Sequence, residues 1–249
     1  MAAGKSREHL MLHDLCAGFS GAEIFNMLYT INNMKNDICK NGNIHLIGIQ
    51  KEFRTRVEEA IRKGLDGASA LLTYNDVVDI AVFDSEEWDI HSKLNLSAHA
   101  RVYYIDIKIC FYKNGLDLDY LFNVDLPATI YHELSHVVRA NTIGYAENLL
   151  QDIIDEGIAC YVEEYSGLAP KQPYVRPIRD EEKYIEDASK HFQVKLSSDL
   201  HSKWFYGSGN LPEWIGYRIG YLMVKKYIEA NKIGIDQLVR SKAEIIAKF

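Results

Sequence analysis

A chain of 249 residues can bury a large hydrophobic core, and its 47% hydrophobic and 25% charged residues are ordinary for a globular protein. A net charge of −7 argues against a nucleic-acid-binding surface, which needs a basic stripe. No run approaches the roughly 18 apolar residues of a membrane span, and the N-terminus shows no secretory leader pattern. The four cysteines form no CxxC pair and are expected to be reduced. We therefore expect a cytoplasmic protein without nucleic-acid or membrane partners.

The first half of the sequence predicts helices alternating with strands. Apolar residues at three- and four-residue spacing predict a helix over 8–39 and a second helix over 51–72. Apolar runs predict buried strands over 44–49 and 77–83. The clearest strand is 101–112, in which isoleucines alternate with Asp, Lys and Cys. This alternation indicates a sheet with one wet face, and 101–112 is a candidate for its edge strand.

Residues 132–136 spell His-Glu-Leu-Ser-His within a segment that is expected to be helical. Asp125 is a good N-cap, Pro127 suits a first turn, and neither Gly nor Pro follows before Gly144. In a helix the two histidines lie one turn apart on the same face, so both imidazoles can bind one metal ion. Glu133 can then act as general base on a metal-bound water without being a ligand. The alternative is an amphipathic core helix whose histidines are only hydrogen-bonded.

The second half of the sequence predicts a mainly helical region. Helices are expected over 146–165, 180–190, 212–231 and 235–249. The helix over 180–190 is strongly charged, which is typical of a solvated face. Residues 167–177 contain three prolines and are a loop or lid candidate, although a plain surface crossing is the simpler interpretation.

A metal site needs a third ligand, which a carboxylate from the following helix can supply. A metzincin would carry Gly and His where this sequence has Arg139 and Thr142, so that subclass is excluded. Glu156 shares a mostly apolar helical face, whereas Asp155 lies on a wetter stripe. A carboxylate on an inward face is costly unless it is paired or metal-bound, so Glu156 is the expected ligand. Gly157 would let the two helices approach closely. The alternative for Glu156 is an ion pair with a nearby Arg or Lys.

These motifs resemble those of a known group of enzymes. HExxH followed about twenty residues later by Glu156-Gly157-Ile158-Ala159 resembles the gluzincin clan of metallopeptidases. More narrowly, the chain resembles the bacterial and archaeal family of predicted zinc-dependent proteases known as the YjaZ-like group. The stretches that match are HELSHVVR, DEGIACYVEEY and WFYG…EWIGYRIGYLMVKKYI, and the likeness covers roughly residues 75–249.

The resemblance implies a zincin-like α+β fold with a small mixed or antiparallel sheet. We expect a single catalytic domain over 1–249. Residues 1–140 would supply helices, the sheet and the active-site helix, and 141–249 a helical subdomain with the glutamate ligand. The resemblance also implies that strand 101–112 forms the upper rim of the cleft, where an extended peptide could add as a strand.

The resemblance assigns roles to the residues of the two motifs. It makes His132, His136 and Glu156 ligands of Zn²⁺ and makes Glu133 the catalytic base. We therefore expect a zinc-dependent metallopeptidase acting on a peptide or protein substrate. The first alternative is a zinc-bearing binding or regulatory module without catalysis, and the second is a metal-free helical scaffold.

Three residues compete for the role of oxyanion donor. Tyr217 comes first, by analogy with the tyrosine of aminopeptidase-like gluzincins, although a core aromatic cluster is an equally good interpretation. Tyr221 lies one turn on and comes second. His201 is available for the role of the distant histidine in thermolysin-like enzymes, but it has no flanking signature. Asp152 is the expected hydrogen-bond acceptor for the metal-binding histidines.

Overall fold

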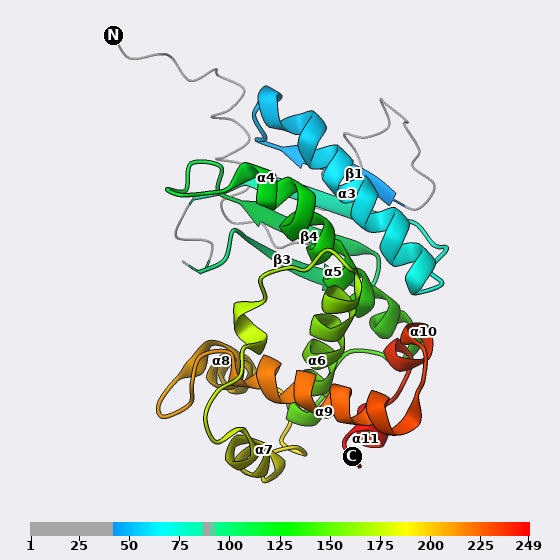
Figure 1. Cartoon of the computed structure of the whole chain (residues 1–249), viewed down its shortest axis with the longest axis vertical. Helices are drawn as coiled ribbons and strands as arrows, with labels where there is room; N and C mark the ends of the chain where they lie inside the picture. The colour runs from blue at the N-terminus through cyan, green and yellow to red at the C-terminus, as the bar shows by residue number, and fades with distance from the viewer. Residues whose placement is uncertain (1–41, 87–90, 92) are drawn as a thin grey trace.

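The structure is a computed structural model that describes residues 42–86, 91 and 93–249. The helix expected over 8–39, with Cys16 and Cys39, lies outside these residues. The described part is a mixed α+β structure built on a four-stranded sheet (Figure 1). The strands are β1 (Gly42–Ile47), β2 (Val78–Asp84), β3 (Leu96–Arg101) and β4 (Tyr104–Ile109).

The sheet has the strand order β1-β2-β4-β3, in which β3 is antiparallel to β4 and the other pairs are parallel. The strand expected over 101–112 is therefore wrong in extent, because β4 covers only its middle part and β3 ends at Arg101. Its position at the edge is also wrong, since β4 lies between β2 and β3. Among the described strands, β1 and β3 form the two edges of the sheet. The sequence of β3, LSAHAR, lacks the β-branched and aromatic residues that usually mark strands.

Two long helices, α3 (Lys51–Leu71) and α5 (Leu126–Thr142), pack against one face of the sheet (Figure 1). Ile105, Ile107 and Ile109 point into this core and are fully buried, as their alternation predicts. Asp106 and Lys108 point to the other face and are half-buried. The sheet therefore places α5 beside the edge strand β3.

The segment before α5 is already helical, which corrects the expected start of the motif helix. A short helix α4 (Leu118–Tyr120) and a π-helical turn η2 (Leu121–Asp125) run directly into α5. The N-cap of this longer unit is Asp117, whose carboxylate accepts hydrogen bonds from two backbone N–H groups. Asp125 has helical backbone angles and caps nothing, and its carboxylate instead accepts a hydrogen bond from Asn95.

The remaining helices form a second group below α5 in Figure 1. They are α6 (Leu149–Tyr165), η3 (Pro173–Val175), α7 (Glu181–Ser189), α8 (Ser198–Ser202), η4 (Lys203–Gly207), α9 (Ile215–Asn231), α10 (Ile235–Val239) and α11 (Ala243–Ile246). The helix expected over 235–249 is thus two short helices. None of the helices in the described residues is long and apolar enough to cross a membrane.

Gly157 of α6 makes a close helix crossing, but with a different partner from the one expected. A Cβ added to Gly157 would lie 2.2 Å from the backbone carbon of Gly220 in α9. The expectation that Gly157 brings α6 against the motif helix is therefore wrong. Arg139 of α5 contacts α6 instead, with its guanidinium 2.5 Å from the Asp155 carboxylate.

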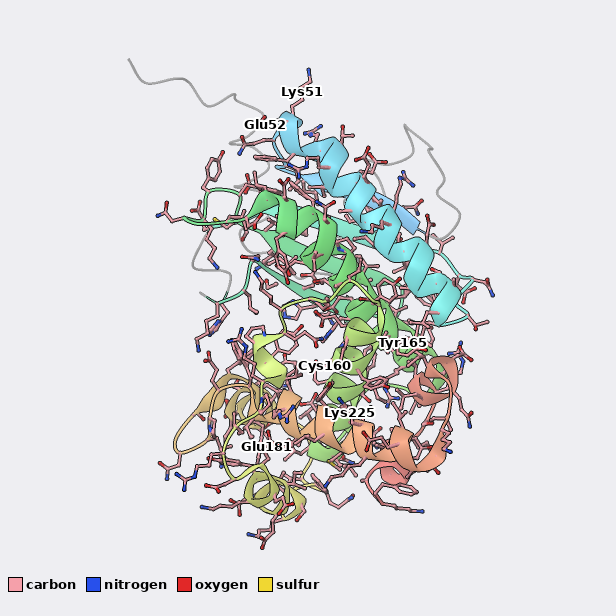
Figure 2. All side chains as sticks on the ribbon, in the orientation of Figure 1. Lys51, Glu52, Cys160, Tyr165, Glu181 and Lys225 are labelled. Carbon is pink, nitrogen blue, oxygen red and sulfur yellow. The ribbon has the colours of Figure 1, made fainter. Side chains whose placement is uncertain are left out.

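The side chains show which surfaces the fold buries (Figure 2). Lys51 and Glu52 in the first turn of α3 point into solvent. Cys160 of α6 is fully buried, and Cys110 is nearly so. Both are free thiols, as expected for cysteines without a CxxC pattern.

Candidate metal centre

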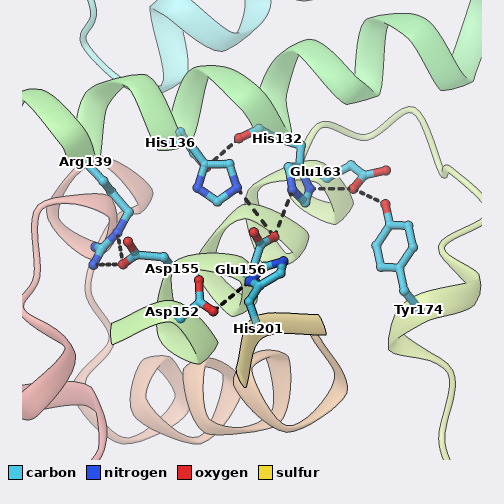
Figure 3. Close-up of polar contacts among 10 residues, drawn as sticks. His132, His136, Arg139, Asp152, Asp155, Glu156, Glu163, Tyr174 and His201 are labelled. Atoms are coloured by element: carbon cyan, nitrogen blue, oxygen red, sulfur yellow. Dashed lines mark hydrogen bonds and ion pairs between the residues drawn. The ribbon is translucent and has the colours of Figure 1, made fainter. Parts of the chain in front are cut away.

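Two histidines of α5 and one glutamate of α6 meet between these helices (Figure 3). The Nε2 atoms of His132 and His136 lie 3.4 Å and 3.5 Å from Oε2 of Glu156. One donor atom from each residue falls within 4.8 Å of the others. The structure thus brings together the three residues that the two motifs predict as ligands.

The donor set fits a zinc ion. Zinc binds His nitrogen and carboxylate oxygen at about 2.0–2.2 Å in tetrahedral geometry, so neighbouring donor atoms lie roughly 3.3–3.6 Å apart. The two measured separations from Glu156 fall in this range. Two imidazoles with one carboxylate are also a known catalytic ligand set, which leaves a fourth position open.

The charges of His132, His136 and Glu156 shift one another's pKa values. Burial alone would lower the pKa of His132 and His136, but the Glu156 carboxylate raises both. Burial disfavours the ionised form of Glu156, yet the charge of His136 and hydrogen bonds from both imidazoles lower the pKa of Glu156 below its usual range. A carboxylate held ionised beside two imidazoles is a site to which a divalent cation is attracted.

A second carboxylate stands behind His132. Oε2 of Glu163 lies 3.1 Å from Nδ1 of His132, and the hydroxyl of Tyr174 donates a hydrogen bond to the same oxygen (Figure 3). Neither Glu163 nor Tyr174 is among the site residues predicted from the sequence. The signal for Glu163 was present, because it lies seven residues after Glu156 and therefore on the same face of α6.

Asp152 does not accept a hydrogen bond from either metal-facing histidine, which corrects the role expected for it. Its Oδ2 atom lies 2.8 Å from Nδ1 of His201 in α8. Burial raises the pKa of Asp152, while its contact with His201 opposes this change. The sequence offered no way to pair two residues from such distant helices.

The candidate metal centre lines a cavity of about 830 Å³ between β3 and the helices of the second half. Glu133 lies on its wall and is only 5% exposed, and burial raises the pKa of its carboxyl group. Residues 94–100 all line the same cavity. Because neighbouring side chains of a strand point to opposite faces, an unbroken run of lining residues means that the backbone edge of β3 faces the cavity. The rim assigned to 101–112 therefore belongs mainly to β3.

Comparison with known proteins identifies the family of this chain. Residues 59–248 match the family described as "Predicted Zn-dependent protease (DUF2268)". The chain belongs to this family. It is also 26% identical over 162 residues to "Uncharacterized protein YjaZ" of Bacillus subtilis (strain 168), a match that covers 62% of this chain and 60% of that protein. The match thus spans less than two thirds of the length of that relative. No solved structure matches the chain.

The three candidate oxyanion donors lie in different places. Tyr217 lines the cavity, with its ring against Tyr174 at 5.4 Å and Phe205 at 5.0 Å between centroids. His201 also lines the cavity and stacks on Phe205 at 4.5 Å. Tyr221 borders a separate surface pocket, and its hydroxyl donates to the exposed Glu164. Tyr217 and His201 thus line the same cavity as the three candidate ligands, whereas Tyr221 lines a different pocket.

Proposed function

We propose that the protein is a zinc-dependent metallopeptidase with a zincin-like arrangement of its helices and edge strand. One observation carries this proposal: His132, His136 and Glu156 converge with zinc-like spacing on the wall of a cavity, with Glu133 beside them. The family description, which names a predicted Zn-dependent protease, supports it. A zinc ion held there would act as a Lewis acid that polarises a peptide carbonyl and acidifies a water molecule.

Glu133 is the proposed general base. It follows His132 directly in α5, so its carboxylate lines the cavity next to the ligand set. It would take a proton from the attacking water and pass it to the leaving amine. Its near-complete burial keeps bulk water from competing for these proton transfers.

The outer edge of β3, which no other described strand covers, is the proposed binding surface for the substrate. Backbone N–H and C=O groups on an edge strand can pair with an extended peptide, which then lies as an added strand. Because residues 94–100 line the same cavity as the metal centre, a peptide paired there would pass the metal-facing side chains. The substrate is therefore an extended segment of polypeptide.

Tyr217 and His201 are the proposed oxyanion donors. Asp152 fixes the imidazole of His201 through Nδ1, which leaves Nε2 to meet a substrate. Removing a true oxyanion donor lowers kcat by about 10²–10³. Comparison of kcat for Tyr217→Phe and His201→Ala will show which residue acts, since a residue that only packs will leave kcat within a few-fold of the wild type.

Substitution of the base tests the proposal directly. Glu133→Gln should retain one zinc ion per chain, measured by elemental analysis. It should lose peptide hydrolysis by about 10²–10⁴, the usual contribution of general acid–base catalysis. Glu52→Gln is the matched control, because Glu52 is exposed in the first turn of α3. Undiminished hydrolysis by Glu133→Gln contradicts the mechanism. Bound zinc with no cleavage of any peptide by the wild type favours a zinc-bearing binding or regulatory module.

A further inference from the structure

The buried carboxylate of Glu163 is not one of the three candidate ligands, yet two hydrogen-bonding side chains contact it. Glu163 is 5% exposed, and a carboxylate at that depth is costly unless it is hydrogen-bonded. The imidazole of His132 and the hydroxyl of Tyr174 both reach its Oε2 atom (Figure 3). The two contacts place Glu163 between the metal-facing histidine and the segment that follows α6.

The two ring nitrogens of His132 face different carboxylates. Nε2 faces Glu156, at 3.4 Å, and Nδ1 faces Glu163, at 3.1 Å. When Nδ1 donates its proton to an acceptor, the neutral ring carries its lone pair on Nε2 and keeps a fixed orientation. Cys160 lies one turn after Glu156, but a thiol is a weak acceptor. The acceptor therefore comes from Glu163, two turns after Glu156.

We propose that Glu163 and Tyr174 form a positioning pair for His132. Glu163 accepts the Nδ1 proton and directs Nε2 toward the metal, and Tyr174 holds the Glu163 carboxylate in place. This inference rests on the proposed zinc site. It makes the segment between α6 and α7 a part of the metal centre, where the sequence indicated a loop or lid candidate, or a plain surface crossing.

Tyr174 is itself held on both sides. Before it, the amide of Gln172 donates to the backbone carbonyl of Cys160 at 2.9 Å. After it, the guanidinium of Arg218 donates to the carbonyl of Val175 at 2.7 Å. The segment is thus tied to α6 and to α9, so the hydroxyl of Tyr174 meets Glu163 at a fixed point.

The next residue of α6 provides a matched control pair. The hydroxyl of Tyr221 donates to Oε2 of Glu164 at 2.5 Å, the same distance as between Tyr174 and Glu163. Glu164 is exposed and Tyr221 does not line the metal cavity. The two pairs share their chemistry and their helix and differ in whether they contact a metal-facing histidine.

The zinc dissociation constant, measured by competition with a chelating dye, tests the pair. Glu163→Gln should bind zinc about 10–100-fold more weakly, the usual effect of removing such a supporting group. Tyr174→Phe should bind roughly 2–10-fold more weakly, as expected for one lost hydrogen bond. Glu164→Gln and Tyr221→Phe should bind zinc as the wild type does. The visible absorption spectrum of the cobalt-substituted protein should change in Glu163→Gln and stay the same in Glu164→Gln.

The outcomes separate this inference from the proposed function. A wild-type protein that binds no zinc overturns both. Zinc bound equally well by the wild type and by Glu163→Gln overturns the positioning pair alone. Equal weakening in Glu163→Gln and Glu164→Gln also overturns it, because the effect would then come from α6 as a whole. Thermal unfolding of the metal-free variants confirms that each is folded.

Discussion

The two helices that carry the metal-facing residues are each packed against an outer helix through glycine, but in different ways. On the sheet side, a Cβ added to Gly64 of α3 would lie 2.7 Å from the Ile130 side chain and from the Pro127 carbonyl of α5. On the helical side, Gly157 of α6 faces Gly220 of α9, and an added Cβ on Gly220 would lie 2.0 Å from a backbone oxygen. The contact between α3 and α5 thus involves a side chain as well as backbone, whereas the contact between α6 and α9 joins backbone to backbone.

The difference shows how each half fixes its share of the metal centre. His132 and His136 come from α5, which lies on the sheet and its buried aliphatic core. Glu156 comes from α6 and directly precedes Gly157, so its position depends on how closely α6 can approach α9. The hydrophobic core beneath α5 therefore fixes the positions of His132 and His136, whereas the crossing of α6 and α9 fixes the position of Glu156.

The largest effect is expected from the contact that joins the two halves. Arg139 is 2% exposed, pairs with Asp155, and donates to the carbonyls of Val239 and Ser241 near the C-terminus. Arg139→Met leaves Asp155, whose side chain is only 16% exposed, without its cation, which should lower the free energy of unfolding by about 3–5 kcal/mol. Denaturant titration measures this. Arg179→Met is the control, since that side chain is 94% exposed, and an equal loss in both variants contradicts the bridging role.

The next effect should come from the close crossing of α6 and α9. Gly220→Ala puts a methyl group where the backbone of α6 lies, so the helices must separate. The free energy of unfolding should fall by about 3 kcal/mol, the upper end for overpacking. Zinc should also bind more weakly, because a shift of α6 displaces Glu156 from its present position 3.4–3.5 Å from the two histidines. Zinc affinity equal to that of the wild type would show that the crossing does not set the position of Glu156.

Gly64→Ala tests the contact between α3 and α5, on the sheet side of the candidate metal centre. The added methyl group presses on Ile130 and Pro127, which should cost about 1–3 kcal/mol of unfolding free energy. Zinc affinity should stay unchanged, because α3 lies on the far side of α5 from the metal centre and α5 carries both histidines together. Denaturant titration and zinc competition measure the two quantities on the same sample. A loss of zinc affinity here equal to that in Gly220→Ala would remove the distinction between the halves.

The smallest effect is expected at an outer contact of the helical half. The Arg218 guanidinium, 2.6 Å from Glu181, lowers the pKa of that carboxyl group from 4.5. A lowered folded-state pKa stabilises the fold at neutral pH, and this stabilisation is lost as pH falls through that pKa. Glu181→Gln removes the negative charge but keeps an oxygen that can accept a hydrogen bond from the buried Arg218, so it should cost only about 1 kcal/mol at pH 7. The difference from wild type in denaturant titrations should shrink in acid, and a difference that grows in acid contradicts the assignment.

The sequence predicts those residues of the site whose placement depends only on the periodicity of the helix that carries them. His132, Glu133 and His136 follow from a repeat of one turn, and Glu156 follows from an inward face that cannot bury an unpaired carboxylate. Glu163 belongs to that same face and could have been predicted with it. Tyr174 and the pairing of Asp152 with His201 depend on where loops and short helices fold back, and no local pattern carries that information.

The fold was predictable where hydrophobic periodicity is strong. The long helices α3, α5, α6 and α9 lie close to their expected positions, as do β1 and β2. The edge strand β3 was missed because its small and polar residues resemble a loop, and 101–112 was extended over the turn that joins β3 to β4. The order of the strands could not be predicted from the sequence, because it is set by pairing between segments that are distant in the chain.

In the part of the chain that the structure describes, β3 pairs with β4 alone, and its other edge is open. An open strand edge on a protein surface invites another sheet to dock and so promotes aggregation. Here the edge lines a cavity of about 830 Å³ together with His132, His136 and Glu156, so a segment that pairs with β3 would lie beside these side chains. Under the proposed function, a segment already paired in a folded sheet would have to leave that sheet before it could pair with β3, so the choice of substrate would depend on conformation as well as on sequence.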